Sequence, residues 1–141
     1  MMLATWLVEF YLSKCNELDD LVASESISND VENLQTERTI LEEDLRNFFD
    51  TYKVFHSKVS EFLSSHNILQ GNLDQTTIYE LIQGHGRTDM YLYYATVVGD
   101  FDRVIEHWIL EDEWTKAIDV VNRQVRFRMV LLTSCANIHT V

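Results

Sequence analysis

The sequence predicts an all-α fold, an α-solenoid of stacked helical hairpins. The 141 residues contain no proline and four glycines, so the two residue types that most often interrupt a helix are scarce. Apolar residues recur at intervals of three and four in nearly every apolar segment, which is the spacing of one helix face. From residue 74 onward, short breaks separate short helical segments, a rhythm that favours a stack of helix pairs.

The first predicted helix is already under way in the stretch TWLVEFYLSK (5–14). No capping sequence precedes it, which is typical of a segment from the middle of a longer polypeptide. Its largest apolar residues repeat at helical spacing, so we expect this face, Trp6 included, to pack in the core. The face consists of Leu3, Trp6, Leu7, Phe10 and Tyr11.

A serine-rich loop is expected over 22–29, since serine and asparagine compete with the helix for backbone hydrogen bonds. Helical periodicity resumes at residue 30, and Glu42 and Arg46 are placed to form an ion pair one turn apart. A weaker helical pattern follows, up to a break near 71–73. The apolar face of this long segment consists of Leu34, Leu41, Leu45, Phe48, Phe49 and Tyr52.

Two shorter helices are predicted on either side of the segment GHGR (84–87). Gly84 or Gly86 would end the first helix, and Thr88 or Asp89 would cap the second. GHGR shares glycines and a basic residue with phosphate-binding loops, but it lacks the lysine followed by serine or threonine, and no strand precedes it. We therefore interpret the segment as a turn between helices and not as a nucleotide site.

The segment 99–121 predicts a helical hairpin that is rich in acid. Apolar residues fall on one stripe in each half, and the polar residues 111–113 supply the turn. His107 and the carboxylates lie off these stripes, so we interpret the acids as the solvent face and His107 as neither catalyst nor ligand. The packing residues expected in the hairpin are Phe101, Trp108, Trp114 and Ala117.

Charge and composition exclude several classes of function. The net charge of −12, from 23 acidic and 11 basic residues, disfavours binding to nucleic acid and to anionic lipid. No nucleophile elbow, glycine-rich nucleotide loop or metal-binding motif occurs, so we predict no enzyme, no cofactor, no metal and no small-molecule ligand. Cys15 and Cys135 lie far apart and are expected as free thiols. Without a signal peptide or an apolar run of membrane-spanning length, we expect a soluble cytoplasmic protein.

Three stretches, in order, resemble the deep-orange family, the family of vacuolar protein sorting-associated protein 18. They are TWLVEFYLSK (5–14), LIQGHGRTDMYLYYATVVGDFDRVIEHWI (81–109) and WTKAIDVV (114–121). The most specific matches are 83–86, 93–95 and 99–101. The resemblance covers most of residues 3–124, more loosely over 20–73. It therefore predicts a solenoid segment over 1–124 and a tail, 125–141, outside the family pattern.

The resemblance implies a place in the long α-solenoid that the family carries between a β-propeller and a zinc-binding RING domain. Two cysteines cannot build a RING, so its zinc site and activity do not carry over. The implied role is a scaffold segment in a subunit of the HOPS and CORVET complexes, which tether membranes before fusion. The implied partners are other class C tethering-complex subunits, at the cytosolic face of late endosomes and the vacuole or lysosome.

Two other interpretations stay open. A clathrin-like or coat-type trafficking solenoid would share the fold and bind different partners. An acidic helical adaptor would bind basic segments, since the chain between Glu17 and Asp50 holds eleven acidic and two basic residues.

Overall fold

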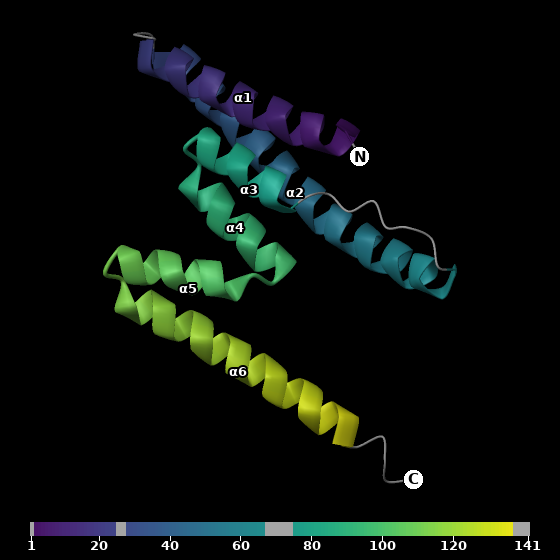
Figure 1. Cartoon of the computed structure of the whole chain (residues 1–141). Helices are drawn as coiled ribbons and strands as arrows, with labels where there is room; N and C mark the ends of the chain where they lie inside the picture. Colours follow the sequence, from purple (N-terminus) through teal and green to yellow (C-terminus); the bar gives the residue numbers. More distant parts are fainter. Residues whose placement is uncertain (1, 25–27, 67–74, 137–141) are drawn as a thin grey trace. The chain divides into compact units, whose positions relative to one another are not determined.

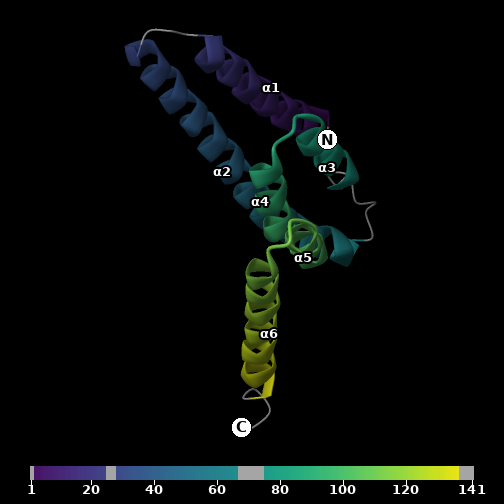
Figure 2. The same cartoon turned by 90° about the vertical axis from the view of Figure 1, so that its left-hand side faces the viewer.

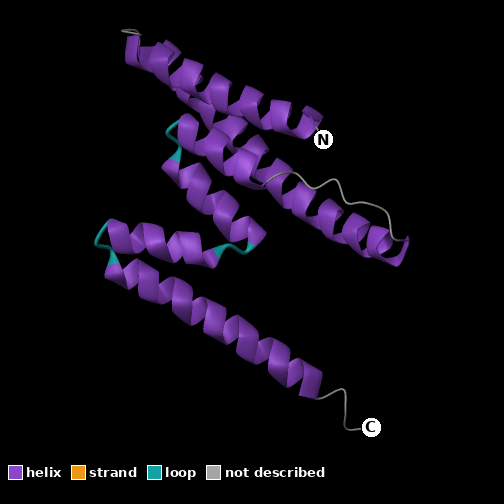
Figure 3. Cartoon of the chain, viewed as in Figure 1, coloured by secondary structure: helices purple, strands orange, loops and turns teal. Residues whose placement is uncertain are grey.

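The computed structural model describes residues 2–24, 28–66 and 75–136, and this part of the chain forms helices joined by short turns. Figure 3 shows no strand within those residues, which confirms the all-α prediction. Of the loop expected over 22–29, residues 22–24 end α1 and residues 28–29 begin α2, so the loop is shorter than predicted, and 25–27 lie outside the described ranges. The break expected near 71–73 lies wholly outside them. The helices are α1 (Met2–Ser24), α2 (Ser28–His66), α3 (Gln75–Gly84), α4 (Thr88–Val98), α5 (Phe101–Leu110) and α6 (Trp114–Ala136).

The helices belong to two compact units, Met1–Val97 and Val98–Val141. In the first unit, α1 lies alongside α2, and α3 packs on α1 (Figures 1 and 2). Helix α4 joins them through Tyr94, whose ring centroid lies 4.8 Å from that of Phe49 in α2 and 5.1 Å from that of Tyr79 in α3. The core consists of Val8, Leu12, Cys15, Leu18, Leu45, Phe49, Ile78, Tyr79, Ile82, Met90, Tyr94, Ala95 and Val97.

Helix α1 buries a different face from the one that its largest residues mark. The buried side is formed by Val8, Leu12, Cys15 and Leu18. These small and medium side chains let α1 approach α2 closely, and dense packing of the interior favours that contact. The face expected in the core is mostly exposed, so the prediction for Trp6, which is 67% exposed, was wrong. We call this face the α1 outer stripe: Leu3, Trp6, Leu7 and Phe10.

Helix α2 contributes Leu45 and Phe49 to the core, as its periodicity predicts. The ion pair expected between Glu42 and Arg46 is not formed. The Arg46 guanidinium reaches α4 instead, where Nη2 lies 3.8 Å from Asp89 Oδ2 and the group lies over the ring of Tyr93. Tertiary partners on α4 therefore replace the local partner that helix spacing suggested.

The second unit is a hairpin of α5 and α6. At its turn, the Asp112 amide donates to the Ile109 carbonyl at 3.1 Å and the Glu113 amide to the Trp108 carbonyl at 2.8 Å. Asp112 has φ 61°, in the left-handed region that glycine commonly occupies after a helix. Its Oδ1 accepts a hydrogen bond from Trp114 Nε1 at 2.8 Å, so the carboxylate ties the turn to the first residue of α6.

Helix α6 continues through Gln124 to Ala136 without a break. The division into a segment 1–124 and a tail 125–141 stays a prediction, since no change of secondary structure marks it. Ala117 is buried in this unit, together with Val104 of α5. None of the described helices combines the length and apolar character needed to cross a bilayer.

Candidate functional site

The segment GHGR forms the turn between α3 and α4, as predicted. The Gly86 amide donates to the Gln83 carbonyl at 2.9 Å, and the Arg87 amide donates to the Ile82 carbonyl at 3.2 Å. This pair of hydrogen bonds closes the end of α3 and requires a left-handed residue between helix and exit, here Gly86 with φ 69°. Arg87 is the next residue after Gly86. It lies in the first unit, and its side chain is only 8% exposed.

The guanidinium of Arg87 has a partner for each of its three nitrogens. Nη1 donates to Glu42 Oε1 at 2.9 Å, and Nη2 donates to Asp19 Oδ2 at 2.6 Å. Nε donates to Asn16 Oδ1 at 3.0 Å. A buried guanidinium is tolerated when its charge is paired and its donors are satisfied, and both conditions are met here. The Arg87 side chain thus joins the α3–α4 turn to both α1 and α2.

A second arginine extends this group of charges. Arg38 Nε lies 3.0 Å from Asp19 Oδ1, and Arg38 Nη2 lies 3.1 Å from Glu42 Oε1. Partial burial lowers the pKa of Arg38, but Glu42 and Asp19 raise it by more, so the net shift is upward. Two arginines thereby neutralise two carboxylates. We call Arg87, Arg38, Asp19, Glu42 and Asn16 the Arg87 cluster.

His85 closes the other side of the turn. Asn16 Nδ2 lies 3.3 Å from the His85 carbonyl oxygen and 3.2 Å from His85 Nδ1. His85 Nε2 lies 3.2 Å from Glu9 Oε1. If Asn16 donates to Nδ1, the proton of a neutral ring sits on Nε2 and is donated to Glu9. The side chains of α1 therefore hold both the backbone and the ring of this turn residue.

Cys15 lies in the core of the same unit and is a free thiol. Burial raises the pKa of the Cys15 thiol, although the nearby positive charge of Arg87 lowers it in part. The protonated thiol is a weak nucleophile, so its surroundings suit packing and not reaction. Among the residues that the structure describes, no group of three or more histidines, cysteines or carboxylates is arranged to hold a metal ion.

Tyr93 supplies another polar contact, between α4 and α2. Its hydroxyl donates to Asp50 Oδ2 at 2.6 Å, and the Arg46 guanidinium lies 5.6 Å from its ring centroid. Burial, followed by the hydrogen bond to Asp50, raises the pKa of Tyr93 to about 12. The arrangement holds α4 against α2 beside the aromatic core.

The residues predicted to pack the hairpin do not all do so. Ala117 is buried, and Phe101 and Trp108 are half-buried. The Trp108 ring has His107 at 4.9 Å between centroids and Lys116 Nζ at 4.5 Å from its centroid. Trp114 is 55% exposed, so its assignment to the core was wrong. It begins α6 at the tight turn, and its indole is drawn toward Asp112 instead of α5.

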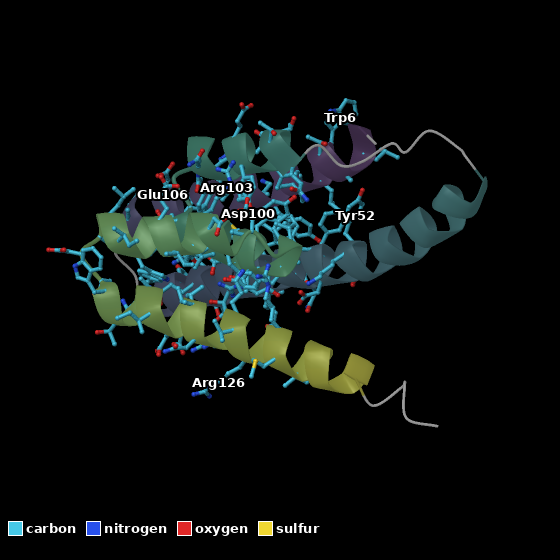
Figure 4. The ribbon with its side chains drawn as sticks, turned by 60° about the horizontal axis from the view of Figure 1, so that its bottom comes forward. Trp6, Tyr52, Asp100, Arg103, Glu106 and Arg126 are labelled. Atoms are coloured by element: carbon cyan, nitrogen blue, oxygen red, sulfur yellow. The ribbon has the colours of Figure 1, made fainter. Side chains whose placement is uncertain are left out.

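Six of the seven hairpin acids are exposed, as predicted, and Asp100 is half-buried. Asp100 stands immediately before α5, but its side chain makes no capping hydrogen bond. Its Oδ2 accepts from Arg103 Nε at 2.9 Å, and the two side chains are labelled in Figure 4. Glu106, also labelled there, is exposed on α5.

The Arg87 cluster was not predicted from the sequence. GHGR was interpreted as a turn, and the only binding function considered for it was a phosphate-binding loop. A usable signal was present: a basic residue follows a glycine helix stop, while Asn16 and Asp19 stand one turn apart in the first helix. Because the partners lie about 70 residues away in sequence, their meeting depends on the tertiary fold.

The chain is similar to curated vacuolar sorting proteins along most of its length. It is 27% identical over 124 residues to the vacuolar protein sorting-associated protein 18 homolog of Danio rerio, covering 86% of this chain and 10% of that protein. It is 25% identical over 122 residues to vacuolar sorting protein 18 of Arabidopsis thaliana, with coverage of 86% and 10%. The vacuolar membrane protein pep3 of Schizosaccharomyces pombe is 23% identical over 124 residues, with coverage of 88% and 12%.

These three matches confirm the resemblance to the deep-orange family. The chain spans about a tenth of the length of these relatives. No protein-family model matches it.

Proposed function

We propose that this chain is a helical scaffold segment that acts in vacuolar protein sorting, within a subunit of a HOPS- or CORVET-type membrane tether. The observation that carries the proposal is the similarity to vacuolar sorting proteins over 86% of the chain. The proposed role is to hold other class C subunits through protein contacts, without catalysis. Its place of action would be the cytosolic face of late endosomes and of the vacuole or lysosome.

The packing of residues in 81–109, one of the stretches that carry the resemblance, supports a scaffold role. His85 and Arg87 bind α1 and α2, and Tyr94 and Ala95 lie in the core. The charge of Arg87 is neutralised by Asp19 and Glu42 inside the first unit, so it is not left to bind a substrate or ion. The residues that carry the resemblance therefore maintain architecture, as expected when a fold is used for spacing and binding.

Affinity purification of the tagged chain from cells tests this proposal. We expect class C vacuolar sorting subunits to be recovered, identified by mass spectrometry. A variant with Leu12→Asp places an unpaired charge in the core and should recover none of them, which shows that capture needs the fold. Recovery of clathrin or coat subunits instead would contradict the proposal and identify a coat-type solenoid.

A second candidate, an acidic adaptor for basic segments, is favoured by the surface of α2. Glu32, Glu37, Glu43 and Asp44 are exposed, and none forms an ion pair with another described residue. Contacts to such a surface would be screened by salt. Basic proteins captured in low salt and lost in high salt, without any vacuolar sorting subunit, would favour this candidate over the scaffold.

A further inference from the structure

Asn16 contacts both Arg87 and His85, and its side-chain amide fits between them in one orientation. Asn16 Oδ1 lies 3.0 Å from Arg87 Nε, a donor, and Asn16 Nδ2 lies 3.3 Å from the His85 carbonyl oxygen, an acceptor. Exchanging the oxygen and the nitrogen of the amide would set donor against donor at Arg87 and acceptor against acceptor at His85. The amide is therefore held in this orientation from both sides.

The orientation of the Asn16 amide decides which nitrogen of His85 carries the proton. Asn16 Nδ2 lies 3.2 Å from His85 Nδ1, so Nδ1 must accept and the proton of a neutral ring is on Nε2. Nε2 faces Glu9 Oε1 at 3.2 Å, and a carboxylate oxygen is an acceptor. The contacts on the two sides of the ring thus require the same tautomer.

The Glu9 carboxylate relies on the His85 ring for its main hydrogen bond. Glu9 Oε2 is buried and has no hydrogen-bond partner among the residues that the structure describes. Glu9 Oε1 accepts from His85 and, at the longer distance of 3.4 Å, from Ser13 Oγ. Since a buried polar atom without a partner is unfavourable, the position of Glu9 depends on the hydrogen bond that His85 donates.

We infer that Asn16 couples Arg87 to Glu9, so that the hydrogen bonds at the two ends of this series strengthen each other. The series runs in one direction, and we call its four side chains the Asn16 network: Arg87, Asn16, His85 and Glu9. No hydrogen bond or ion pair joins Arg87 to Glu9 directly within the described residues. Members of one hydrogen-bond network polarise and orient each other, which makes the effects of their removal interdependent.

The Asn16 network connects two parts of the first unit. Arg87 also donates to Glu42 on α2 at 2.9 Å, so one end of the network belongs to the contact between the α3–α4 turn and α2. The other end, Glu9, lies about two helical turns before Asn16 on α1. A change at Glu9 should therefore weaken the hold of the turn on α2, from a distance.

A double-mutant cycle in the purified full chain tests the coupling. Arg87→Lys keeps the positive charge and lacks the Nε donor that orients Asn16, whereas Glu9→Ala removes the acceptor at the other end. Each variant lowers the folding equilibrium constant by a factor that urea denaturation measures. We expect the combined loss to be at least about three-fold smaller than the product of the two single losses, because either substitution already disorders the network.

Two further cycles show whether the coupling passes through Asn16. In an Asn16→Ala background the losses from Arg87→Lys and Glu9→Ala should multiply, because the link between them is absent. In the wild-type background the losses from Arg87→Lys and Tyr93→Phe should also multiply. Tyr93 is the matched control, since its hydroxyl joins α4 to Asp50 of α2 outside the Asn16 network.

Nuclear magnetic resonance tests the network without the double variant. At about pH 8, where histidine is ordinarily neutral, the ring nitrogen shifts of His85 should show a proton on Nε2 and none on Nδ1. Glu9→Ala alone, at a side chain that is 45% exposed, should make the Arg87 Nε hydrogen exchange with water at least about three-fold faster.

Three results would overturn the inference. A proton on His85 Nδ1 would show that Asn16 does not donate to the ring. Multiplying losses in the wild-type background, or unchanged Arg87 Nε exchange in Glu9→Ala, would show that Arg87 and His85 hold the turn independently. Coupling that persists in the Asn16→Ala background would assign it to a route other than Asn16, such as direct attraction between the charges.

Discussion

At the scale of single residues, Arg87 concentrates the polar interactions of the first unit. Three nitrogens of one side chain reach a carboxylate on α2, a carboxylate on α1 and an amide on α1. Removing a buried charge from such a group leaves its partners unpaired, which costs more than the net contribution of the intact pair.

The variant Arg87→Met should therefore lower the free energy of unfolding by about 3 kcal/mol, measured by urea denaturation. The free energy of unfolding of Arg87→Lys should lie between those of the wild type and Arg87→Met. One ammonium keeps the positive charge but cannot satisfy three acceptors arranged around a guanidinium. The control is Arg126→Met, at an exposed arginine without an ion pair in the described structure, which should change stability by less than about 0.5 kcal/mol. Equal losses at both positions would contradict the role given to Arg87.

We expect the folded chain to lose stability at alkaline pH because of Tyr93. Its pKa is raised from 10.0 to about 12 in the folded chain, so the unfolded chain releases this proton first as pH rises. The stabilising contribution is complete below pH 10 and is lost as pH approaches 12. Thermal melts should show a steeper fall in Tm across this window for the wild type than for Tyr93→Phe. Parallel curves for the two proteins would contradict the prediction.

At the scale of elements, α1 shows what helical periodicity can and cannot decide. The sequence predicts a helix there correctly, but α1 is apolar on two sides, and the side with the larger residues is the exposed one. Burial depends on which side fits against α2, and that information lies in the partner helix. The same limit explains why the contacts of Arg87 were not predicted. Its partners lie on α1 and α2, and they meet Arg87 only once the helices have packed.

The two sides of α1 should differ in their sensitivity to truncation. Leu12→Ala should cost about 2–5 kcal/mol, because it empties a site that is 1% exposed. Phe10→Ala removes a larger side chain that is 53% exposed, and it should cost less than Leu12→Ala. Urea denaturation of the two variants measures the order. A greater loss for Phe10→Ala would mean that the α1 outer stripe is packed in solution.

In the α5–α6 hairpin, a buried and an exposed position can be compared by substituting tryptophan at each. Ala117→Trp overfills a buried position and should destabilise the hairpin by about 1–3 kcal/mol. Ile118→Trp places the same side chain one residue further along, at a position that is 58% exposed, and should be nearly neutral. Helix content of 98–136, followed by hydrogen exchange, distinguishes the two. Equal tolerance at both positions would contradict the close contact assigned to Ala117.

At the scale of the whole molecule, the two units differ in how much apolar side chain they bury. Among the side chains that the structure describes, thirteen hydrophobic residues are buried in the first unit and two, Val104 and Ala117, in the second. Local opening costs less where fewer apolar contacts are broken. The α5–α6 hairpin is therefore the less stable part of the chain.

Hydrogen exchange followed by mass spectrometry should show this difference. Amides of α5 and α6 should exchange at least about ten-fold faster than core amides of α1, α3 and α4, since protection reports the free energy of local opening. Protection of α6 equal to that of α1 would contradict the lower stability of the α5–α6 hairpin.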